Sequence, residues 1–133
     1  MIVDTSAIAA ILLGESAAAT LLEALEHAEV GIALSAVSLV ETSIVLHTRL
    51  PNFSDDLLDD FLASYEVQVI PVSVAQAHRA RAAFQQFGKG TEHPARLNFG
   101  DCFTYALAAE RNHPLLFTGT DFRQTDLTSV FLD

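Results

Sequence analysis

Four acidic residues follow or flank short apolar segments of this chain, and their carboxylates could together hold a cation. They are Asp4 in "MIVDTSA", Glu41 in "SAVSLVET", Asp101 in "FGDCFTYALA" and Asp121 in "LLFTGTDF". Carboxylates gathered in one pocket raise one another's pKa unless a cation neutralises them. Clusters that offer only oxygen ligands suit hard ions such as Mg²⁺ or Mn²⁺. Such an ion polarises a phosphoryl oxygen and lowers the pKa of a bound water, so the four acids together indicate metal-assisted hydrolysis.

Each acid alone has an ordinary structural explanation. Asp4 is a good N-cap for the helix that follows it, Asp101 suits a helix N-terminus, and Asp121 suits a turn. Ser38 and Glu41 have the spacing of a capping box. The helix around Glu41 is expected to begin near residue 36, however, which puts this acid beyond the first turn. A carboxylate among apolar neighbours there needs a partner.

The elements that must position these acids alternate between short apolar strands and longer helices. This alternation predicts one α/β domain with a mainly parallel sheet and helices on both faces. Ligands bind at the carboxyl ends of such strands, so Asp4, Asp101 and Asp121 are expected at one edge of the sheet, with Glu41 reaching it from its helix. The predicted strands are Ile2–Asp4, Val30–Ser35, Val67–Pro71, Leu115–Thr118 and Ser129–Leu132. The predicted helices are Ser6–Leu13, Ser16–Ala28, Ala36–Arg49, the stretch capped by Ser54, Val74–Phe87 and Asp101–Asn112.

Composition narrows the class of protein. The chain has 133 residues, one cysteine and a formal net charge of −10, which predicts a single domain over residues 1–133 without a disulfide framework. No apolar run reaches membrane-spanning length and no basic segment opens the chain, so we expect neither a membrane protein nor a secretory signal, and a cytoplasmic location. The negative charge weakly disfavours a nucleic-acid substrate, although cations bound by the acids would offset it locally.

Four blocks in this order, "MIVDTSAI", "SAVSLVET", "FGDCFTYALA" and "LLFTGTDF", resemble the sequence blocks of PIN-domain ribonucleases. The similarity is greatest to VapC-type toxins of toxin–antitoxin pairs and spans residues 2 to about 122. It implies a three-layer α/β/α sandwich and Mg²⁺- or Mn²⁺-dependent endonucleolytic cleavage of RNA. It also implies inhibition by a cognate antitoxin, and a homodimer. The metal-binding and catalytic residues of the family correspond to Asp4, Glu41, Asp101 and Asp121.

Hydroxyl groups and one further acid near these blocks are candidates for lesser roles. Thr5, Ser6 and Thr120 could donate hydrogen bonds to a phosphate or to the carboxylates, although capping and turn roles are equally compatible with their positions. Asp126 could join the rim of the site, but its spacing favours a surface turn. Cys102, although it is next to Asp101, is expected to be a buried core thiol.

Two other functions are compatible with a small acidic α/β domain. A PIN-like module could bind RNA or protein without cleaving, but such a module need not retain all four acids. A receiver-type phosphoacceptor domain would need two adjacent acids after the first strand and a late lysine. The "VDTS" segment and the absence of lysine after Lys89 count against it.

Overall fold

Four parallel strands form the centre of the molecule in the computed structural model, which describes residues 1–130. They are β1 (Ile2–Val3), β2 (Ala33–Ser35), β3 (Gln68–Ile70) and β4 (Leu115–Leu116), in the spatial order β3-β2-β1-β4. Ile2 is in register with both Ala33 and Leu115, so β1 lies between β2 and β4. The chain therefore moves outward from β1 to β3 and returns to the other side of β1 to form β4.

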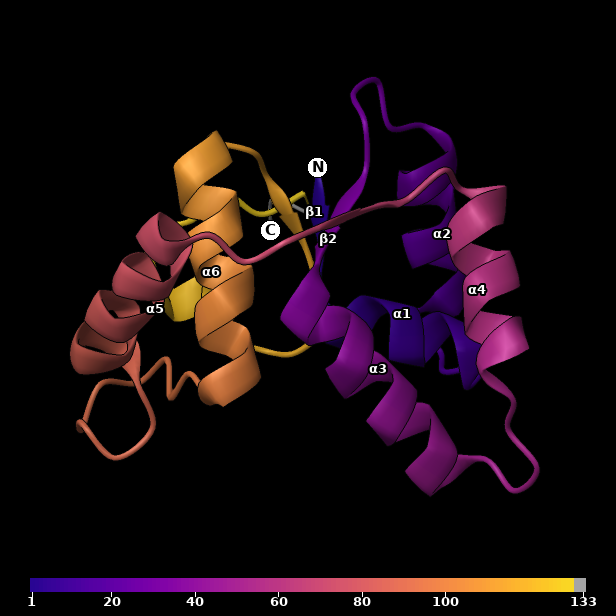
Figure 1. The fold of residues 1–133 in the computed structure, drawn as a ribbon, viewed down its shortest axis with the longest axis horizontal. Coiled ribbons are helices and arrows are strands. Elements are labelled where there is room, and N and C mark those ends of the chain that lie inside the picture. Colours follow the sequence, from indigo (N-terminus) through magenta and orange to yellow (C-terminus); the bar gives the residue numbers. More distant parts are fainter. Residues whose placement is uncertain (131–133) are drawn as a thin grey trace.

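Helices cover both faces of this sheet, as the alternation of elements predicts (Figure 1). In the view of Figure 1, α5 and α6 lie to the left of the strands, and α1 to α4 lie to the right. The helices are α1 (Thr5–Leu12), α2 (Ala18–Glu26), α3 (Ala36–Arg49), α4 (Asp55–Ser64), α5 (Val74–Phe87) and α6 (Phe99–Arg111), and a 3₁₀ turn, η1, spans Phe122–Gln124. The architecture is a three-layer α/β/α sandwich with a parallel sheet.

Alternation along the strands produces two separate apolar cores. Val3 and Leu116 face α1 to α4 and pack with residues such as Ile8. Ile2 and Leu115 face the opposite side and pack against α5 and α6. Both faces of each central strand are therefore buried, which explains why these segments are continuously apolar rather than alternating with polar residues.

Five helices begin at a side chain that accepts a hydrogen bond from the first turn. The caps are Asp4 for α1, Ser35 for α3, Ser54 for α4, Ser73 for α5 and Asn98 for α6. Each cap satisfies a backbone N–H that has no partner inside its own helix. Because Asp4 directly follows β1 and Ser35 is the last residue of β2, the switch from strand to helix occurs within one residue at these two points.

Several predicted boundaries differ from the observed ones. The bounds predicted for α3 and α5 are those observed, but α6 begins at Phe99, so the prediction that Asp101 starts this helix was wrong. Helix α2 is shorter than predicted, and all strands are shorter by one to three residues. The predicted strand at Ser129 is reduced to one bridge with Leu115, and its last two residues lie outside the described part of the chain.

No helix in the described residues is long and apolar enough to cross a lipid bilayer.

Candidate active site

Asp4 lies where the direction of the sheet connections reverses, at the carboxyl end of β1. Its backbone N–H donates to the carbonyl of Leu116 at 3.0 Å, which extends the pairing with β4. Its side chain is 3% exposed and accepts two hydrogen bonds, from the backbone N–H of Ser6 at 2.9 Å and from the Thr104 hydroxyl at 2.9 Å. Asp4 is thus both the N-cap of α1 and a buried carboxylate at the crevice where ligands bind in open parallel sheets.

Buried hydroxyl groups connect Asp4 to α3 and α6. Thr104 Oγ1 donates to Asp4 Oδ1 and lies 3.0 Å from Ser38 Oγ. Thr42 Oγ1 lies 2.9 Å from Thr5 Oγ1 and donates to the Ser38 carbonyl at 2.6 Å. Because buried polar groups are costly without partners, this network fixes the relative positions of α1, α3 and α6 around the acids.

Asp101 is the third residue of α6 and part of its capping box. Asn98 Oδ1 accepts from the Asp101 N–H at 2.9 Å, and Asp101 Oδ2 accepts from the Asn98 N–H at 3.0 Å. This reciprocal pair fixes the first turn of the helix. Asp101 therefore has the helix-capping role that the sequence allows. It is also buried, with 8% exposure, and the charges of other acids act on it.

Glu41 reaches the same place from the second turn of α3, where it is half-buried. It makes no capping box, because Ser35 caps the helix and the Ser38 hydroxyl lies beside Thr104 instead. The Glu41 carboxylate lies against Gly100, so closely that a Cβ atom on this glycine would clash with it. Gly100 thus provides the space that brings α3 and the start of α6 together.

Asp121 comes from the segment after β4, directly before η1. It is exposed and makes no capping hydrogen bond to η1. Thr120 beside it is also exposed, and Gly119 has a φ of +88°, a backbone conformation that favours glycine. Asp126 is held elsewhere, since its Oδ1 accepts a 2.6 Å hydrogen bond from the Tyr105 hydroxyl.

The other three acids lie close enough to Asp101 for their charges to act on its pKa. The pKa of Asp101 is raised to about 7, chiefly by burial; the Asn98 N–H lowers it, and the negative charges of Asp4, Glu41 and Asp121 add to the rise. Burial also raises the pKa of Glu41; the neighbouring Thr5 hydroxyl lowers it and the Asp4 charge raises it. Elements far apart in the sequence therefore bring negative charges together at one edge of the sheet.

The donor set fits a hard divalent cation, because it consists of carboxylate oxygens that repel one another without one. Within residues 1–130, no three histidine, cysteine, aspartate or glutamate side chains are grouped closely enough to hold a metal ion as they stand. The chemistry of the donors and the raised pKa of Asp101 thus favour a cation, while the present side-chain positions do not form a closed set of ligands.

The candidate hydroxyls near Asp4 are engaged in the fold. Thr5 Oγ1 donates to the Ser38 carbonyl at 3.2 Å, and Ser6 Oγ accepts from the Thr118 N–H at 3.1 Å. Ser6 therefore ties the start of α1 to the end of β4. The structural roles that the sequence allowed for Thr5 and Ser6 are present.

Three hydroxyl residues around the site were not predicted from the sequence: Ser38, Thr42 and Thr104. Their helical spacing could have indicated that they lie beside the acids. Thr104 follows Asp101 by three residues, and Ser38 and Thr42 are four residues apart and flank Glu41, so each polar residue shares a helix face with an acid or with another hydroxyl. All three are at most 1% exposed.

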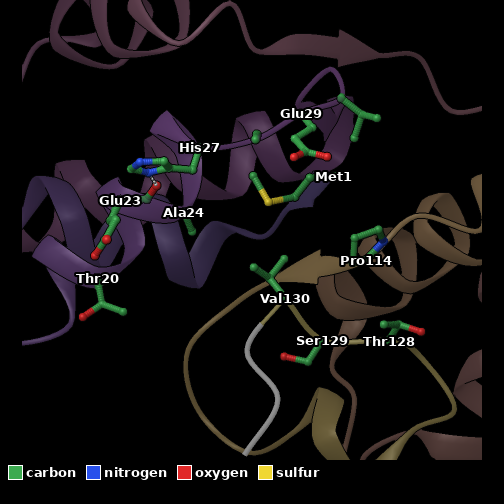
Figure 2. A pocket seen from close by; sticks show the side chains of 12 residues that line it. Met1, Thr20, Glu23, Ala24, His27, Glu29, Pro114, Thr128, Ser129 and Val130 are labelled. Atoms are coloured by element: carbon green, nitrogen blue, oxygen red, sulfur yellow. Dashed lines mark hydrogen bonds between the residues drawn. The ribbon is translucent and has the colours of Figure 1, made fainter.

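Cys102 and His27 have structural roles and are not part of the candidate site. Cys102 is buried, and burial raises the pKa of its thiol to about 11, in agreement with the predicted core role. A mostly apolar pocket of about 550 Å³ lies near the start of β1 and is lined by Met1, His27, Val130 and others, with none of the four acids (Figure 2). His27 Nδ1 lies 2.9 Å from the Glu23 carbonyl, which is a helix-end contact.

The chain is similar to proteins of one known family over nearly its whole length. The family model described as "PIN domain" matches residues 1–127. The chain is 50% identical over 125 residues to ribonuclease VapC28 of Mycobacterium tuberculosis, covering 94% of this chain and 93% of that protein. It is 46% identical over 127 residues to ribonuclease VapC42 of the same species, covering 96% of each.

Two solved structures share the fold at low sequence identity. VapC20 of Mycobacterium tuberculosis, described as a Sarcin-Ricin loop cleaving toxin, superimposes with a TM-score of 0.77 at 20% identity over 97% of both chains. A chain of a toxin–antitoxin complex from Klebsiella pneumoniae superimposes with a TM-score of 0.66 at 20% identity, covering 91% of this chain and 88% of that one.

Proposed function

Because this chain belongs to the PIN-domain family and is 46–50% identical to VapC ribonucleases over nearly its whole length, we propose that it is a metal-dependent endoribonuclease. In this proposal the protein hydrolyses phosphodiester bonds of RNA and acts as the toxin of a toxin–antitoxin pair. The family assignment removes the receiver-type alternative. The alternative is a PIN-like module that binds RNA or protein without cleaving RNA, and experiment must distinguish it from the ribonuclease.

One observation carries the proposal: Asp4 and Asp101 are buried carboxylates at the same edge of the sheet, and the charges of Asp4, Glu41 and Asp121 add to the effect of burial in raising the pKa of Asp101 to about 7. A protein gains no stability from collecting like charges at one point. The position of these acids at the ligand-binding edge of the sheet is therefore best explained by a cation that they bind and that in turn binds a phosphate of the substrate.

In this proposal Asp4, Glu41, Asp101 and Asp121 hold Mg²⁺ or Mn²⁺. When bound, the ion supplies polarisation of the phosphoryl group and a lowered pKa of water. Asp4 is suited to a fixed position, because Thr104 and the Ser6 N–H hold both of its oxygens. Glu41 and Asp121 make fewer contacts and can adjust to the substrate. Thr5, Ser6 and Thr120 are candidate contacts to the phosphate.

Hydrolysis by water has a product signature that tests the proposal further. Attack of water opposite the 3′-oxygen breaks the P–O3′ bond and leaves a 5′-phosphate and a 3′-hydroxyl. Attack by the 2′-hydroxyl of RNA would instead leave a 2′,3′-cyclic phosphate. The proposed reaction therefore also predicts that a single 2′-deoxy nucleotide at the cleaved position does not prevent cleavage.

Partners and location complete the proposal. We infer a cognate antitoxin that covers the active groove, a homodimer, a single domain over residues 1–133, and action in the cytoplasm. The support for an antitoxin is the high identity to VapC proteins. Co-expression with the product of a neighbouring short reading frame, followed by purification and light scattering, measures both the antitoxin complex and the homodimer.

The central experiment incubates purified protein with single-stranded RNA and Mg²⁺ or Mn²⁺. We expect cleavage that EDTA abolishes, and a loss of at least 100-fold in kcat/KM for Asp4→Asn and for Asp101→Asn. Asp126→Asn is the matched control, because this acid is engaged by Tyr105 and should leave activity near the wild-type level. Cleavage that persists in EDTA, or that survives Asp4→Asn, would refute the metal nuclease. RNA binding without any cleavage would favour the silent module.

A further inference from the structure

The exposed aromatic ring of Phe99 lies close in sequence to Asp101 and takes no part in the proposed hydrolysis. Phe99 is the first residue of α6 and is 73% exposed. It is two residues from Asp101, and the glycine between them touches the Glu41 carboxylate. Phe99 shares a groove with the exposed side chains of Val40 and Ile44, and exposed apolar side chains gathered in a patch mark a contact with another molecule.

The ring lies between two surface grooves. One groove, of about 630 Å³, is lined by α3 and the start of α6 and includes both Glu41 and Phe99. The other, of about 530 Å³, is lined by α5 and α6 and includes Phe99, Phe103 and Arg81. Phe99 therefore shares one groove with Glu41 and the other with Arg81, so a strand that lies in both grooves would contact the ring, the acid and the cation.

The position of the Phe99 ring is well defined. Its backbone belongs to the first turn of α6, which the reciprocal hydrogen bonds of Asn98 and Asp101 fix. Phe103, one turn later, packs against Phe99 with ring centroids 5.0 Å apart. One side of the aromatic pair is thus supported by the protein while Phe99 remains open to solvent, which is the arrangement of a stacking platform.

We propose that Phe99 stacks on a base of the RNA strand next to the cleaved phosphate, and that Arg81 binds a phosphate further along the same strand. This inference rests on the proposed ribonuclease function. Single-stranded RNA is bound by aromatic rings that stack on bases and by cations that track the backbone. Arg81 makes no ion pair with any described residue, so its charge is available in a chain whose net charge is −10.

RNA is favoured over a second protein copy because of the position of the ring relative to the acids. Substrate must reach Glu41 for cleavage to occur, and Phe99 shares the groove of Glu41. The aliphatic residues of that groove, among them Val40 and Ile44, would also suit a protein surface. A contact between copies is therefore the competing outcome that the experiment must detect.

The test uses short single-stranded RNA oligomers that carry one 2-aminopurine, placed at each position in turn, because stacking quenches the fluorescence of this base. Binding is measured in Ca²⁺ in place of Mg²⁺, with gels that show the oligomer stays intact. We expect strong quenching at one or two adjacent positions with the wild-type protein, loss of this quenching in Phe99→Ala, and its retention in Phe99→Trp. Phe99→Ala should weaken RNA binding by about tenfold.

Matched variants separate the roles of the ring and of the cation. Leu57→Ala removes another exposed apolar side chain, which lies on α4 and lines neither groove, and should leave the quenching pattern unchanged. Arg81→Gln should weaken binding to all RNA sequences and lower the salt dependence by about one counterion. An oligomer with an abasic site at the quenched position should be cleaved more slowly by the wild type, but without further loss by Phe99→Ala.

Unchanged RNA affinity and quenching in Phe99→Ala would overturn the proposal. If the same variant also changes from dimer to monomer in light scattering, the ring serves contact between protein copies. Failure of the wild-type protein to cleave any RNA would refute the ribonuclease function itself. Normal cleavage by both wild type and Phe99→Ala would refute only the role of Phe99.

Discussion

At the scale of single residues, Asp4 and Asp101 are held by small neutral groups, and neither forms an ion pair with a described residue. Asp4 is buried and accepts from Thr104 and from a backbone N–H, and Asp101 accepts from the backbone of Asn98. A lysine or arginine in these places would neutralise the carboxylates and compete with a metal ion. Hydroxyl and N–H donors orient the carboxylates while leaving their negative charge available.

Thr104→Val tests the hydroxyl that orients Asp4. Removal of this donor leaves a buried carboxylate oxygen without its partner, so we expect the free energy of unfolding to fall by about 1–3 kcal/mol and cleavage to slow. Thr104→Ser keeps the hydroxyl and should restore most of both. Chemical denaturation and cleavage assays measure the two effects, and wild-type behaviour of Thr104→Val would exclude a positioning role.

Gly100→Ala tests the space that Glu41 occupies. The added Cβ would clash with the Glu41 carboxylate, and displacement of this side chain should lower kcat by about 10- to 100-fold. Stability should change little, because Gly100 lies within a helix, where alanine is tolerated. Gly31→Ala is the control, since a Cβ added to Gly31 would meet no other atom within 4 Å. Equal activity of the two variants would contradict the role assigned to Gly100.

At the scale of elements, α6 links stability to the site. Its first turn carries the capping box, Asp101 and Phe99, while its middle supplies Thr104 and the core contacts of Ala106. The N-terminus of a helix also has partial positive charge, which favours an anionic group. Helix α6 therefore positions Asp101, exposes the Phe99 ring and packs one layer of the sandwich against the sheet.

Asn98→Ala should affect both stability and activity. Loss of the cap is expected to lower the free energy of unfolding by about 1 kcal/mol and to reduce cleavage, because the first turn that holds Asp101 frays. Ser54→Ala removes the cap of α4, which carries none of the four acids, and should lower stability similarly without a comparable loss of activity. Thermal melts and kcat/KM measured on both variants test this, and equal activity losses would refute it.

The sequence predicted the elements better than the contacts between them. Helices α3 and α5 have clear apolar spacing and serine caps, so their bounds follow from local rules. The start of α6 was misplaced although the spacing of Asn98 and Asp101 is a capping signal. The hydrogen bond between Asp4 and Thr104 joins residues 100 positions apart, and no local pattern contains such a contact. The parallel sheet led us to expect the four acids at one edge, and their joint role as metal ligands stays a prediction. Their hydrogen-bond partners were not predicted.

At the scale of the whole molecule, the burial of Asp101, together with the negative charges near it, makes stability depend on pH. The folded-state pKa of Asp101 is about 7, above its ordinary value of 3.8, so the folded protein binds a proton more tightly than the unfolded chain. This contribution is fully present below about pH 4 and is lost as pH rises to about 7. In the metal-free protein, Asp101 should therefore lower the free energy of unfolding across this range.

The difference between wild type and Asp101→Asn isolates this effect from other titrating groups. Denaturation in EDTA between pH 4 and pH 8 should show that wild type loses stability relative to Asp101→Asn as pH rises. Mg²⁺ or Mn²⁺ should raise the melting temperature of the wild type more at pH 8 than at pH 5, because ligands must lose their protons before they bind a metal. A metal effect that is independent of pH, or equal in Asp101→Asn, would contradict this account.

The central position of β1 has a consequence for synthesis of the protein in the cell. The first strand is made earliest, but it acquires its β4 neighbour, and Asp4 its partner Thr104, only after about a hundred further residues have been added. Asp121 follows later still. A ribosome that translates this message therefore carries a chain without all four acids until Asp121 has been added. If the mature protein attacks RNA, this order of assembly keeps the growing chain harmless to the machinery that makes it.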